Sequence, residues 1–536
     1  MMTRRTFFEA GLQSGVAASA AAASRPNILF LMADQFRYDC LGANGNRLIH
    51  TPNLDRLAAR SANFSQAFVQ SPVCVPSRVS YFTGRYAHSH KNRVNYTPCD
   101  PREVFLQRML HDAGYQTASV GKLHFYPPTA EHARSTGFDR VLLHDGVGIT
   151  DPYSDYVKWR RAHDPQASIP YTALAKDVPP GKNPFRASIE YRFGPTHWTG
   201  EETCRTLREL STSPKPFYLL SSFFKPHSPF QTPAPYDAMY DKVDIPLPRR
   251  VTLDDIRALP LPVQKLILRG RPEYAILPSR LEWMYRSYYA AVSMVDYEIG
   301  RILDELERTG RARNTIVVFA TDHGAQLLEH GLMDKNVFFE SSVHVPFLIS
   351  AKGAVRTIVG DRNGFAPHSV LREFPKNHPG RIAPRRYGDL VEMVDVLPTL
   401  LELCGLPISD RVQGRSFAPL VAGQRAAYTP REIVFSENII PEVITGGALK
   451  MPFVPGQGIA GIRHPDAKMA RTRRWKLNYY PGNGAELYDL ENDPVEQRNL
   501  IADPAYQAQM RELKTAILDW MITADENDQI ARRWLL

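Results

Sequence analysis

The stretch TIVVFATDHG, at residues 315–324, joins an uninterrupted apolar run to a polar end. Such a run is typical of a strand that other elements cover on both faces. The runs ILFLM, at residues 28–32, and FYLLSSFF, at residues 217–224, have the same character, and a helical pattern spans residues 281–308. Because buried strands alternate with helices, the sequence predicts an α/β fold with a mostly parallel central sheet flanked by helices.

Polar residues of the kind that bind metals or anions follow each predicted strand. They are DQ at 34–35, GKLH at 121–124, KPH at 225–227 and DH at 322–323. In open α/β sheets, binding sites form beyond the carboxyl ends of the strands. We therefore expect these segments, which are distant in the sequence, to converge on one cleft.

The length of the chain, 536 residues, predicts more than one structural unit, because a single hydrophobic core rarely grows to that size. Short alternating segments in the C-terminal part suggest a small antiparallel sheet, followed by a closing helix over 506–522. These segments are 433–435, 475–480 and 486–490. We predict a catalytic domain over residues 25–424 and a smaller α+β domain over residues 425–536. The weakly periodic residues 142–200 and 352–386 are interpreted as insertions.

The N-terminus has the features of an export signal. TRRTFF, at residues 3–8, resembles a twin-arginine motif, and the Gly/Ala stretch at 11–23 is too short to span a membrane. Small residues of the A-x-A type end this stretch. We predict that residues 1–24 are a signal segment read by the twin-arginine export machinery. The protein is then expected to work in the periplasm or outside the cell.

Charge and cysteine usage narrow the class of function. The formal net charge is +9, and a surplus of Lys and Arg attracts anions. No basic run with interleaved aromatic residues indicates nucleic-acid binding, so an anionic small molecule or polysaccharide is the expected ligand. The five cysteines form no C-x-x-C pair, which argues against a zinc–thiolate site, and they are too few for a disulfide scaffold.

The most specific pattern is CVPSR, at residues 74–78, followed by TGR at 83–85. It resembles the signature of the sulfatases, which have an alkaline-phosphatase-like fold, and ELYDLENDPVEQRNL at 486–500 resembles their C-terminal signature. In that family a formylglycine-generating enzyme oxidises the cysteine to an aldehyde. One oxygen of the aldehyde hydrate attacks sulfur, and the other then helps to expel the sulfate. The resemblance implies that Cys74 becomes formylglycine and that the chain is a sulfuric ester hydrolase.

The resemblance also implies a divalent metal ion. The doublets at residues 34–35 and 322–323 match the two metal-binding doublets of the family, and Cys74 would complete the site. The implied ligands are Asp34, Gln35, Cys74, Asp322 and His323. Ligands that are mostly oxygen, with one histidine, suit a hard cation, and calcium is the usual one in sulfatases. Many sulfatases have Asp where Gln35 stands. Because the amide of Gln35 is neutral, the site carries one negative charge fewer, and manganese and magnesium are alternatives to calcium.

Five basic residues fall in the order in which the family places its catalytic side chains. By this resemblance, Arg78 would hold the formylglycine, Lys122 would neutralise sulfate oxygens, and His124 would hydrogen-bond the formylglycine hydroxyl. His227 would face the leaving-group oxygen, and Lys335 would be shared by substrate and leaving group. Such donors stabilise the charge that develops in a transition state.

A phosphonate or phosphate ester hydrolase of the same superfamily is the alternative. The Asp-Gln doublet and the TGRY run that continues to Asn95 also resemble phosphonate monoester hydrolases. Those enzymes generally lack the G-K-x-H element, which is present at residues 121–124, so the sequence favours sulfate esters. A catalytically silent protein that binds sulfated glycans is a further alternative. It is disfavoured because each catalytic position that the family resemblance implies carries the expected type of polar residue.

The expected substrate is a sulfated saccharide or a small sulfate ester. Export, positive charge and the KPHSPF run at residues 225–230, which resembles iduronate-type sulfatases, favour a carbohydrate. The candidate substrate contacts are His88, His90, Asn95, Arg192, His197 and Arg471. His344 stands where the family commonly has arginine, so the side-chain pairing around residues 340–346 stays open.

Overall fold

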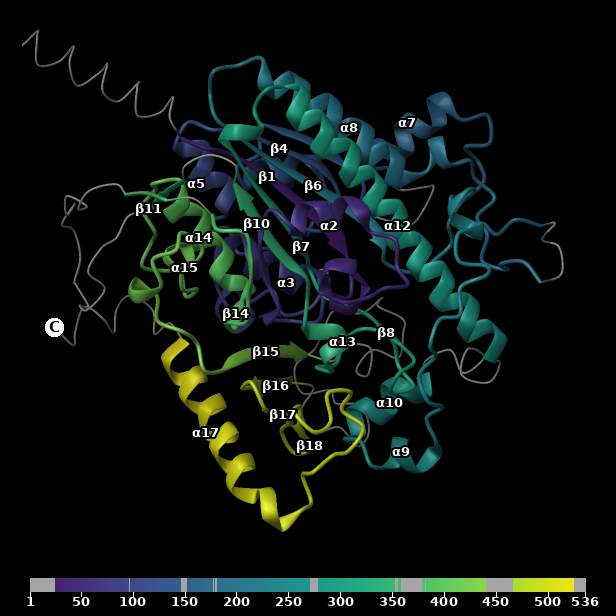
Figure 1. The fold of residues 1–536 in the computed structure, drawn as a ribbon, viewed down its shortest axis with the longest axis vertical. Coiled ribbons are helices and arrows are strands. Elements are labelled where there is room, and N and C mark those ends of the chain that lie inside the picture. The colour runs from purple at the N-terminus through teal and green to yellow at the C-terminus, as the bar shows by residue number, and fades with distance from the viewer. Residues whose placement is uncertain are drawn as a thin grey trace, which may run out of the picture.

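An eight-stranded sheet forms the centre of the computed structural model (Figure 1). The structure describes residues 25–95, 97–145, 152–176, 178, 181–269, 278–351, 355–357, 378–380, 382–439 and 466–524. The strands stand in the order β13-β2-β10-β7-β1-β6-β4-β5. Their bounds are β1 Asn27–Asp34, β2 Ala62–Phe64, β4 Gln116–Gly121, β5 Arg140–Leu143, β6 Phe217–Pro226, β7 Thr315–Thr321, β10 Phe347–Ala351 and β13 Arg385–Tyr387. The predicted signal segment, residues 1–24, lies outside the described residues.

The middle of this sheet is parallel. β1 pairs in parallel with β6 on one side and β7 on the other, and β4 pairs in parallel with β6 and β5. Every residue of β1, β6 and β7 is buried. The prediction of a mostly parallel α/β sheet with strands covered on both faces is therefore confirmed.

Helices cover the two faces of the sheet and form two separate cores. The helices are α3 Cys74–Thr83, α5 Leu106–Asp112 and α14 Val396–Leu403 on one face, and α8 Pro195–Ser211 and α12 Pro278–Arg308 on the other. Successive side chains of a strand point to opposite faces. Accordingly, Ile28 and Phe30 of β1 join the first core, whereas Leu29 and Leu31 join the second.

Helix α8 is the main difference from the sequence-based prediction, which placed an insertion over residues 142–200. This helix begins inside that stretch and packs against α12 and β6 (Figure 1). Its buried face includes small and hydroxylated residues, such as Gly200 and Thr203, so few large apolar side chains mark this helix in the sequence. A Cβ on Gly200 would lie 2.0 Å from Oε2 and 3.1 Å from Cβ of Glu298, so a larger residue there would displace the Glu298 side chain of α12.

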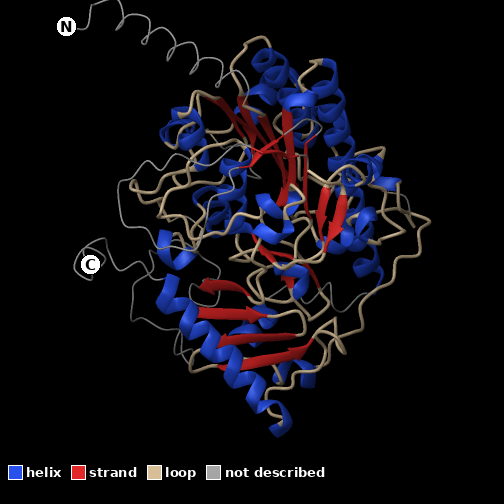
Figure 2. Ribbon diagram, turned by 60° about the vertical axis from the view of Figure 1, so that its left-hand side comes forward, coloured by secondary structure: helices blue, strands red, loops and turns tan. Residues whose placement is uncertain are grey.

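A second sheet follows in the C-terminal part of the chain. Its strands, in spatial order, are β15 Val434–Ile439, β16 Asp466–Arg471, β17 Trp475–Tyr480 and β18 Gly484–Asp489, and all neighbours are antiparallel. Helix α17, Gln507–Ala524, crosses one face of this sheet (Figure 2). Trp520 of α17 stacks on Phe435 with ring centroids 4.7 Å apart. The predicted antiparallel sheet and closing helix are confirmed, and the boundary between residues 424 and 425 stays a prediction.

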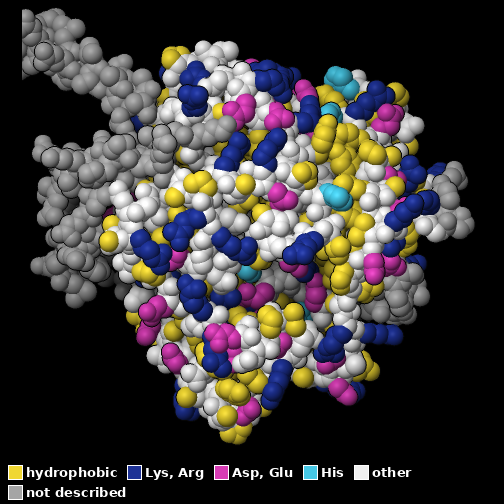
Figure 3. All heavy atoms as spheres, in the orientation of Figure 1, with side chains coloured by type: hydrophobic (Ala, Val, Ile, Leu, Met, Phe, Trp, Pro, Cys, Tyr) yellow, Lys and Arg dark blue, Asp and Glu magenta, His cyan; other side chains and the backbone are white. Residues whose placement is uncertain are grey.

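Shorter elements complete the described chain. The helices are α2 Pro52–Ala58, α4 Ala87–His90, α6 Ala130–Ser135, α7 Asp155–His163, α9 Leu253–Arg257, α10 Leu261–Arg269, α13 Glu340–Val343 and α15 Ala418–Val421. The strands are β3 Ala67–Phe68, β8 Gln326–Leu327, β9 Met333–Asp334, β11 Val355–Thr357, β12 His378–Gly380 and β14 Val391–Glu392. Within the described ranges, no helix is both long and apolar enough to cross a membrane. Lys and Arg are spread over the face shown in Figure 3, with Asp and Glu between them.

A buried cluster of charges joins the C-terminal sheet to the rest of the protein. Glu340, the first residue of α13, lies 3.2 Å from the guanidinium of Arg471 and 3.1 Å from the ammonium of Lys476. Burial alone would raise the pKa of Glu340, but Arg471 and Lys476 hold it well below its usual range. His344 stacks on Tyr38 with ring centroids 3.8 Å apart. The sequence left the pairing of residues 340–346 open because His344 stands where the family commonly has arginine. In the structure, Arg471 at the end of β16 pairs with Glu340.

We expect Arg471→Ala to lower the free energy of unfolding by about 3 kcal/mol, because it leaves the partly buried Glu340 carboxylate with one cation fewer. Urea denaturation of the full chain measures this loss. Arg56→Ala is the matched control, since Arg56 pairs with Asp304 at the surface, where both side chains are more than half exposed. A loss at Arg471 no larger than at Arg56 would contradict the prediction.

Candidate active site

The carboxyl ends of four parallel strands meet at one edge of the central sheet. β1 ends at Asp34, and β7 is followed directly by Asp322. β4 is followed by Lys122, and β6 by His227. Because these strands are parallel and adjacent, the polar residues at their ends lie together, as the sequence analysis expected.

Cys74 joins this edge from the N-terminal end of α3. Its Sγ lies 3.2 Å from Nε2 of His323 and 3.2 Å from Nζ of Lys335. Burial alone would raise the pKa of the Cys74 thiol, but Lys335 and Lys122 hold it well below its usual value. The first backbone N–H groups of a helix favour negative charge, and one of them, on Val75, donates to Oδ1 of Asn95. The surroundings of residue 74 therefore favour an anion.

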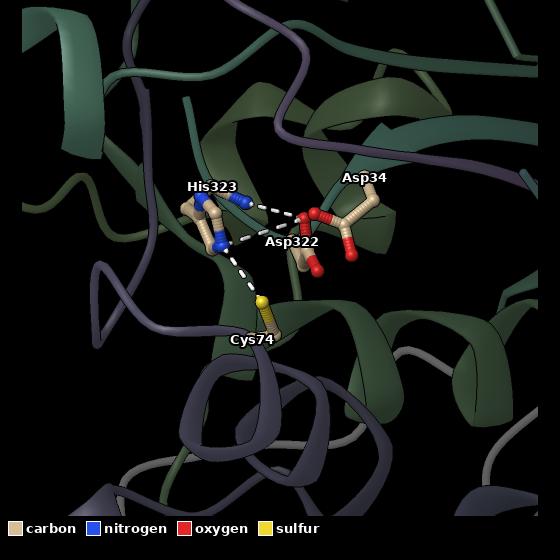
Figure 4. A group of neighbouring side chains, drawn as sticks. All are labelled: Asp34, Cys74, Asp322 and His323. Atoms are coloured by element: carbon tan, nitrogen blue, oxygen red, sulfur yellow. Dashed lines mark hydrogen bonds and ion pairs between the residues drawn. The ribbon is translucent and has the colours of Figure 1, made fainter. Parts of the chain in front are cut away.

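Four side chains form a cluster that could hold a cation. The ligand atoms of Asp34, Cys74, Asp322 and His323 all lie within 4.8 Å of one another, and Figure 4 shows the four groups pointing toward one another. All four residues are buried. Oδ1 of Asp34 has no hydrogen-bond partner among the described residues, which is costly for a buried acceptor. A divalent cation would satisfy it, so these residues fit such an ion.

Hydrogen bonds orient the members of this cluster. Nδ1 of His323 donates to the carbonyl oxygen of Gly324 at 2.8 Å, which turns Nε2 toward Cys74. Oδ1 of Asp322 accepts from the backbone N–H of Gln35 at 3.1 Å and from that of His323 at 3.0 Å. The imidazole and the carboxylate are therefore fixed before any ion binds.

Arg78 holds the two carboxylates of the cluster. Its side chain is completely buried, with Nε 2.8 Å from Asp322 and Nη2 3.4 Å from Asp34. Nη1 donates to the carbonyl oxygen of Lys122 at 2.8 Å and to the hydroxyl of Ser222 at 3.0 Å. The expectation that Arg78 holds residue 74 directly stays a prediction, because these hydrogen bonds go instead to the carboxylates and to the ends of β4 and β6.

Basic side chains line the other side of Cys74. Nζ of Lys335 is 2.8 Å from Nε2 of His227, and Lys122 forms an ion pair with Asp34. Burial and the nearby Lys335 lower the pKa of His227, so its imidazole is neutral. Nδ1 of His227 donates to the carbonyl oxygen of Ser228 at 2.6 Å, which leaves Nε2 to accept from Lys335. Two ammonium groups and a neutral imidazole therefore face residue 74.

Two residues near Cys74 were missed by the sequence analysis. Asp145 accepts from the backbone N–H groups of Leu123 and His124 at 2.7 and 2.9 Å, and so holds His124 in its left-handed conformation. It lies just beyond the end of β5, so the strand-end rule could have found it. Asp334 accepts from the side-chain amide of Gln35 at 3.1 Å. No sequence pattern marks that contact.

Of the six candidate substrate contacts, Asn95 is hydrogen-bonded to the first turn of α3, at the backbone N–H of Val75 next to Cys74. The other five have different partners: His88 with Glu437, His90 with Ser80, Arg192 with Glu190, His197 with Glu298 and Arg471 with Glu340. Burial lowers the pKa of His90 to about 3, as expected for a histidine inside the fold. Within the described part of the chain, none of these contacts reaches the cation cluster, so a substrate role for the five stays a prediction without support.

Known proteins resemble this chain over most of its length. Residues 26–406 match the profile of the family described as Sulfatase. An arylsulfatase of Clostridium perfringens is 28% identical over 515 residues, covering 92% of this chain and 94% of that protein. Iduronate 2-sulfatase of Mus musculus is 30% identical over 424 residues, covering 73% and 71%. Among solved structures, a phosphonate monoester hydrolase from Silicibacter pomeroyi superposes with a TM-score of 0.76 at 23% identity, over 94% of this chain and 96% of that one, which shows the alkaline-phosphatase-like fold.

Proposed function

Because the chain belongs to the sulfatase family and is a sulfuric ester hydrolase, we propose that it removes sulfate from a sulfated saccharide with a formylglycine at residue 74 and a divalent cation. The cluster of Asp34, Cys74, Asp322 and His323 carries this proposal, since it places the residue to be modified within reach of cation ligands. Calcium is the proposed ion because the donors are mostly oxygen, with manganese and magnesium as alternatives.

The two groups that the protein must acquire supply distinct parts of the chemistry. Formylglycine at residue 74 would supply the attacking oxygen, and a cation held by Asp34, Gln35, Asp322 and His323 would draw electron density from the sulfate. The chain's own residues position the substrate and offset the negative charge of its sulfate group.

Lys122 and Lys335 flank residue 74 and offset the negative charge of the sulfate group. Each such donor lowers the barrier by about 3 kcal/mol when it faces developing charge. Lys335 also donates to Nε2 of His227, which places this neutral imidazole on the side proposed for the leaving oxygen. Nδ1 of His124 is buried without a hydrogen-bond partner among the described residues, so this atom is available to a bound ligand.

A saccharide is the proposed substrate for two reasons. Iduronate 2-sulfatase, the relative at 30% identity, is named for a sugar acid. The chain also carries a surplus of nine positive charges, which favours anionic substrates. We further propose that residues 1–24 direct export by the twin-arginine machinery to the periplasm or beyond, and that a formylglycine-generating enzyme modifies Cys74.

Phosphonate monoester hydrolysis is the second candidate. It is favoured by the Asp34-Gln35 doublet and by the contact of Asn95 with the start of α3. The decisive comparison is turnover of an aryl sulfate and an aryl phosphonate monoester with the same leaving group, by protein in which mass spectrometry detects formylglycine. We expect a higher kcat/KM for the sulfate, and faster turnover of the phosphonate would overturn the assignment. A panel of sulfated saccharides then tests the substrate class by release of free sulfate.

Lys122→Met is expected to lower kcat/KM for the aryl sulfate about 100- to 1,000-fold, because one cation next to the reacting anion is lost. Steady-state kinetics with protein of equal formylglycine content measures the effect. Lys242→Met, at an exposed position, is the matched control and should leave kcat/KM unchanged. An unchanged kcat/KM for Lys122→Met would remove Lys122 from the site.

A further inference from the structure

The side-chain amide of Gln35 is held at both ends by two consecutive residues. Its Nε2 donates to Oδ1 of Asp334 at 3.1 Å, and its Oε1 lies 3.3 Å from Nζ of Lys335. The hydroxyl of Ser228 donates to the same oxygen of Asp334 at 2.9 Å. The amide therefore has a defined orientation.

The orientation matters because the two ends of an amide are chemically opposite. The carbonyl oxygen can bind a cation, whereas the NH₂ group is only a donor. The oxygen lies beside the ammonium of Lys335, which is 3.2 Å from Sγ of Cys74 in the cation cluster, and rotation of the amide by half a turn would put NH₂ there instead. A carboxylate is an acceptor only, so Asp334 can pair with the NH₂ end of Gln35 and not with its oxygen.

The backbone explains how two neighbours reach the two ends of one side chain. Asp334 is the last residue of β9, in the short hairpin in which it pairs with Gln326 of β8. It has a left-handed conformation, with φ of 71°, which bends the chain between Asp334 and Lys335. An aspartate tolerates this conformation better than most side chains.

We propose that Asp334, seated by Ser228, positions the Gln35 amide so that its oxygen faces the cation. Glutamine is a neutral ligand, and Asp334, which contacts Gln35 rather than the cation, supplies a negative charge nearby. This inference rests on the proposed cation site and adds a positioning role for two residues behind it. Groups that hold a metal ligand from behind commonly change metal affinity 10- to 100-fold when they are removed.

The test is the affinity of the full-length protein for Ca²⁺ and Mn²⁺, measured by calorimetry or by competition with a fluorescent chelator. Asp334→Ala is expected to weaken cation binding about 10- to 100-fold. Asp334→Asn keeps an acceptor without the charge and should have a smaller effect. Ser228→Ala, the mildest change, should weaken binding about threefold to tenfold, through loss of one hydrogen bond to Asp334.

The double variant separates positioning from general damage to the site. In Gln35→Glu the ligand is a carboxylate, which has no donor end and needs no orienting acceptor. Adding Asp334→Ala to Gln35→Glu should therefore leave cation affinity unchanged or raise it, since it also removes a nearby like charge. An equal loss in both backgrounds would overturn the inference, as would a wild-type affinity in Asp334→Ala and Ser228→Ala.

The failure of this inference can be distinguished from a failure of the proposed function. If the wild-type protein binds neither cation, the proposed metal centre fails and the positioning role fails with it. If the wild-type protein binds a cation and desulfates an aryl sulfate while the Asp334 variants bind equally well, the positioning role alone is wrong. Circular dichroism of each variant tests whether the fold is retained. If Asp334→Ala does not fold, the cation affinities of Asp334→Asn and Ser228→Ala test the inference.

Discussion

Cys74→Ala is expected to lower kcat/KM for an aryl sulfate by at least about 10,000-fold, because it removes the residue that provides the nucleophile while the surrounding donors stay in place. Loss of a nucleophile usually leaves only the contribution of binding and charge stabilisation. Steady-state kinetics with the aryl sulfate measures the loss, and mass spectrometry of the wild-type protein tests whether residue 74 is formylglycine.

The matched control is Cys204→Ala, on α8. Cys204 is also buried, and burial raises the pKa of its thiol to about 12, the opposite of the shift at Cys74. We expect this variant to keep the formylglycine content and kcat/KM of the wild type. If Cys74→Ala retained a tenth or more of the wild-type kcat/KM, the nucleophile would have to come from another residue.

The central sheet could be predicted from the sequence because its strands are uninterrupted apolar runs. β1 supplies alternate side chains to two cores, so both of its faces must be apolar, and this leaves a clear pattern. Helix α8 is marked less clearly, because few of its buried residues are large and apolar. Its contacts with α12 include the close approach at Gly200 and the ion pairs of His197 with Glu298 and of Glu201 with Arg301, where space and charge rather than hydrophobicity decide the residue. The fit of one helix to another depends on a partner far away in the sequence.

The same distinction applies to the site. Asp34 and Asp322 could be placed together because they end adjacent parallel strands, and strand order makes their proximity a geometric consequence. The substrate candidates were chosen by residue type, and side chains such as Arg471 instead pair with acids that lie far away in the sequence. A basic residue shows its charge in the sequence but not its partner. Asp334 was missed for the same reason, since it acts on Gln35, which lies 299 positions away.

Asp322→Asn is expected to weaken cation binding by at least about 100-fold and to lower the free energy of unfolding by about 3 kcal/mol. The buried Asp322 carboxylate accepts from Arg78 through one oxygen and from two backbone N–H groups through the other. In asparagine one of these acceptors becomes an NH₂ donor, so a donor meets a donor whichever way the amide turns. Arg78 is also left with Asp34 as its only carboxylate partner among the described residues.

Asp296→Asn is the matched control for a buried aspartate without a cation. Asp296 accepts from the backbone N–H of Leu54 at 2.7 Å through one oxygen and from the backbone and side-chain N–H groups of Asn53 at 3.2 and 2.9 Å through the other, and it has no ion-pair partner among the described residues. Burial raises its pKa to about 6, and no cation of the protein pairs with its charge among the described residues. We expect no change in cation affinity, although a donor also meets a donor here and the free energy of unfolding falls as well. If Asp322→Asn bound the cation as tightly as Asp296→Asn, Asp322 would not be a ligand. If its unfolding in a chelating buffer matched that of the wild type, the pairing with Arg78 would contribute nothing to the fold.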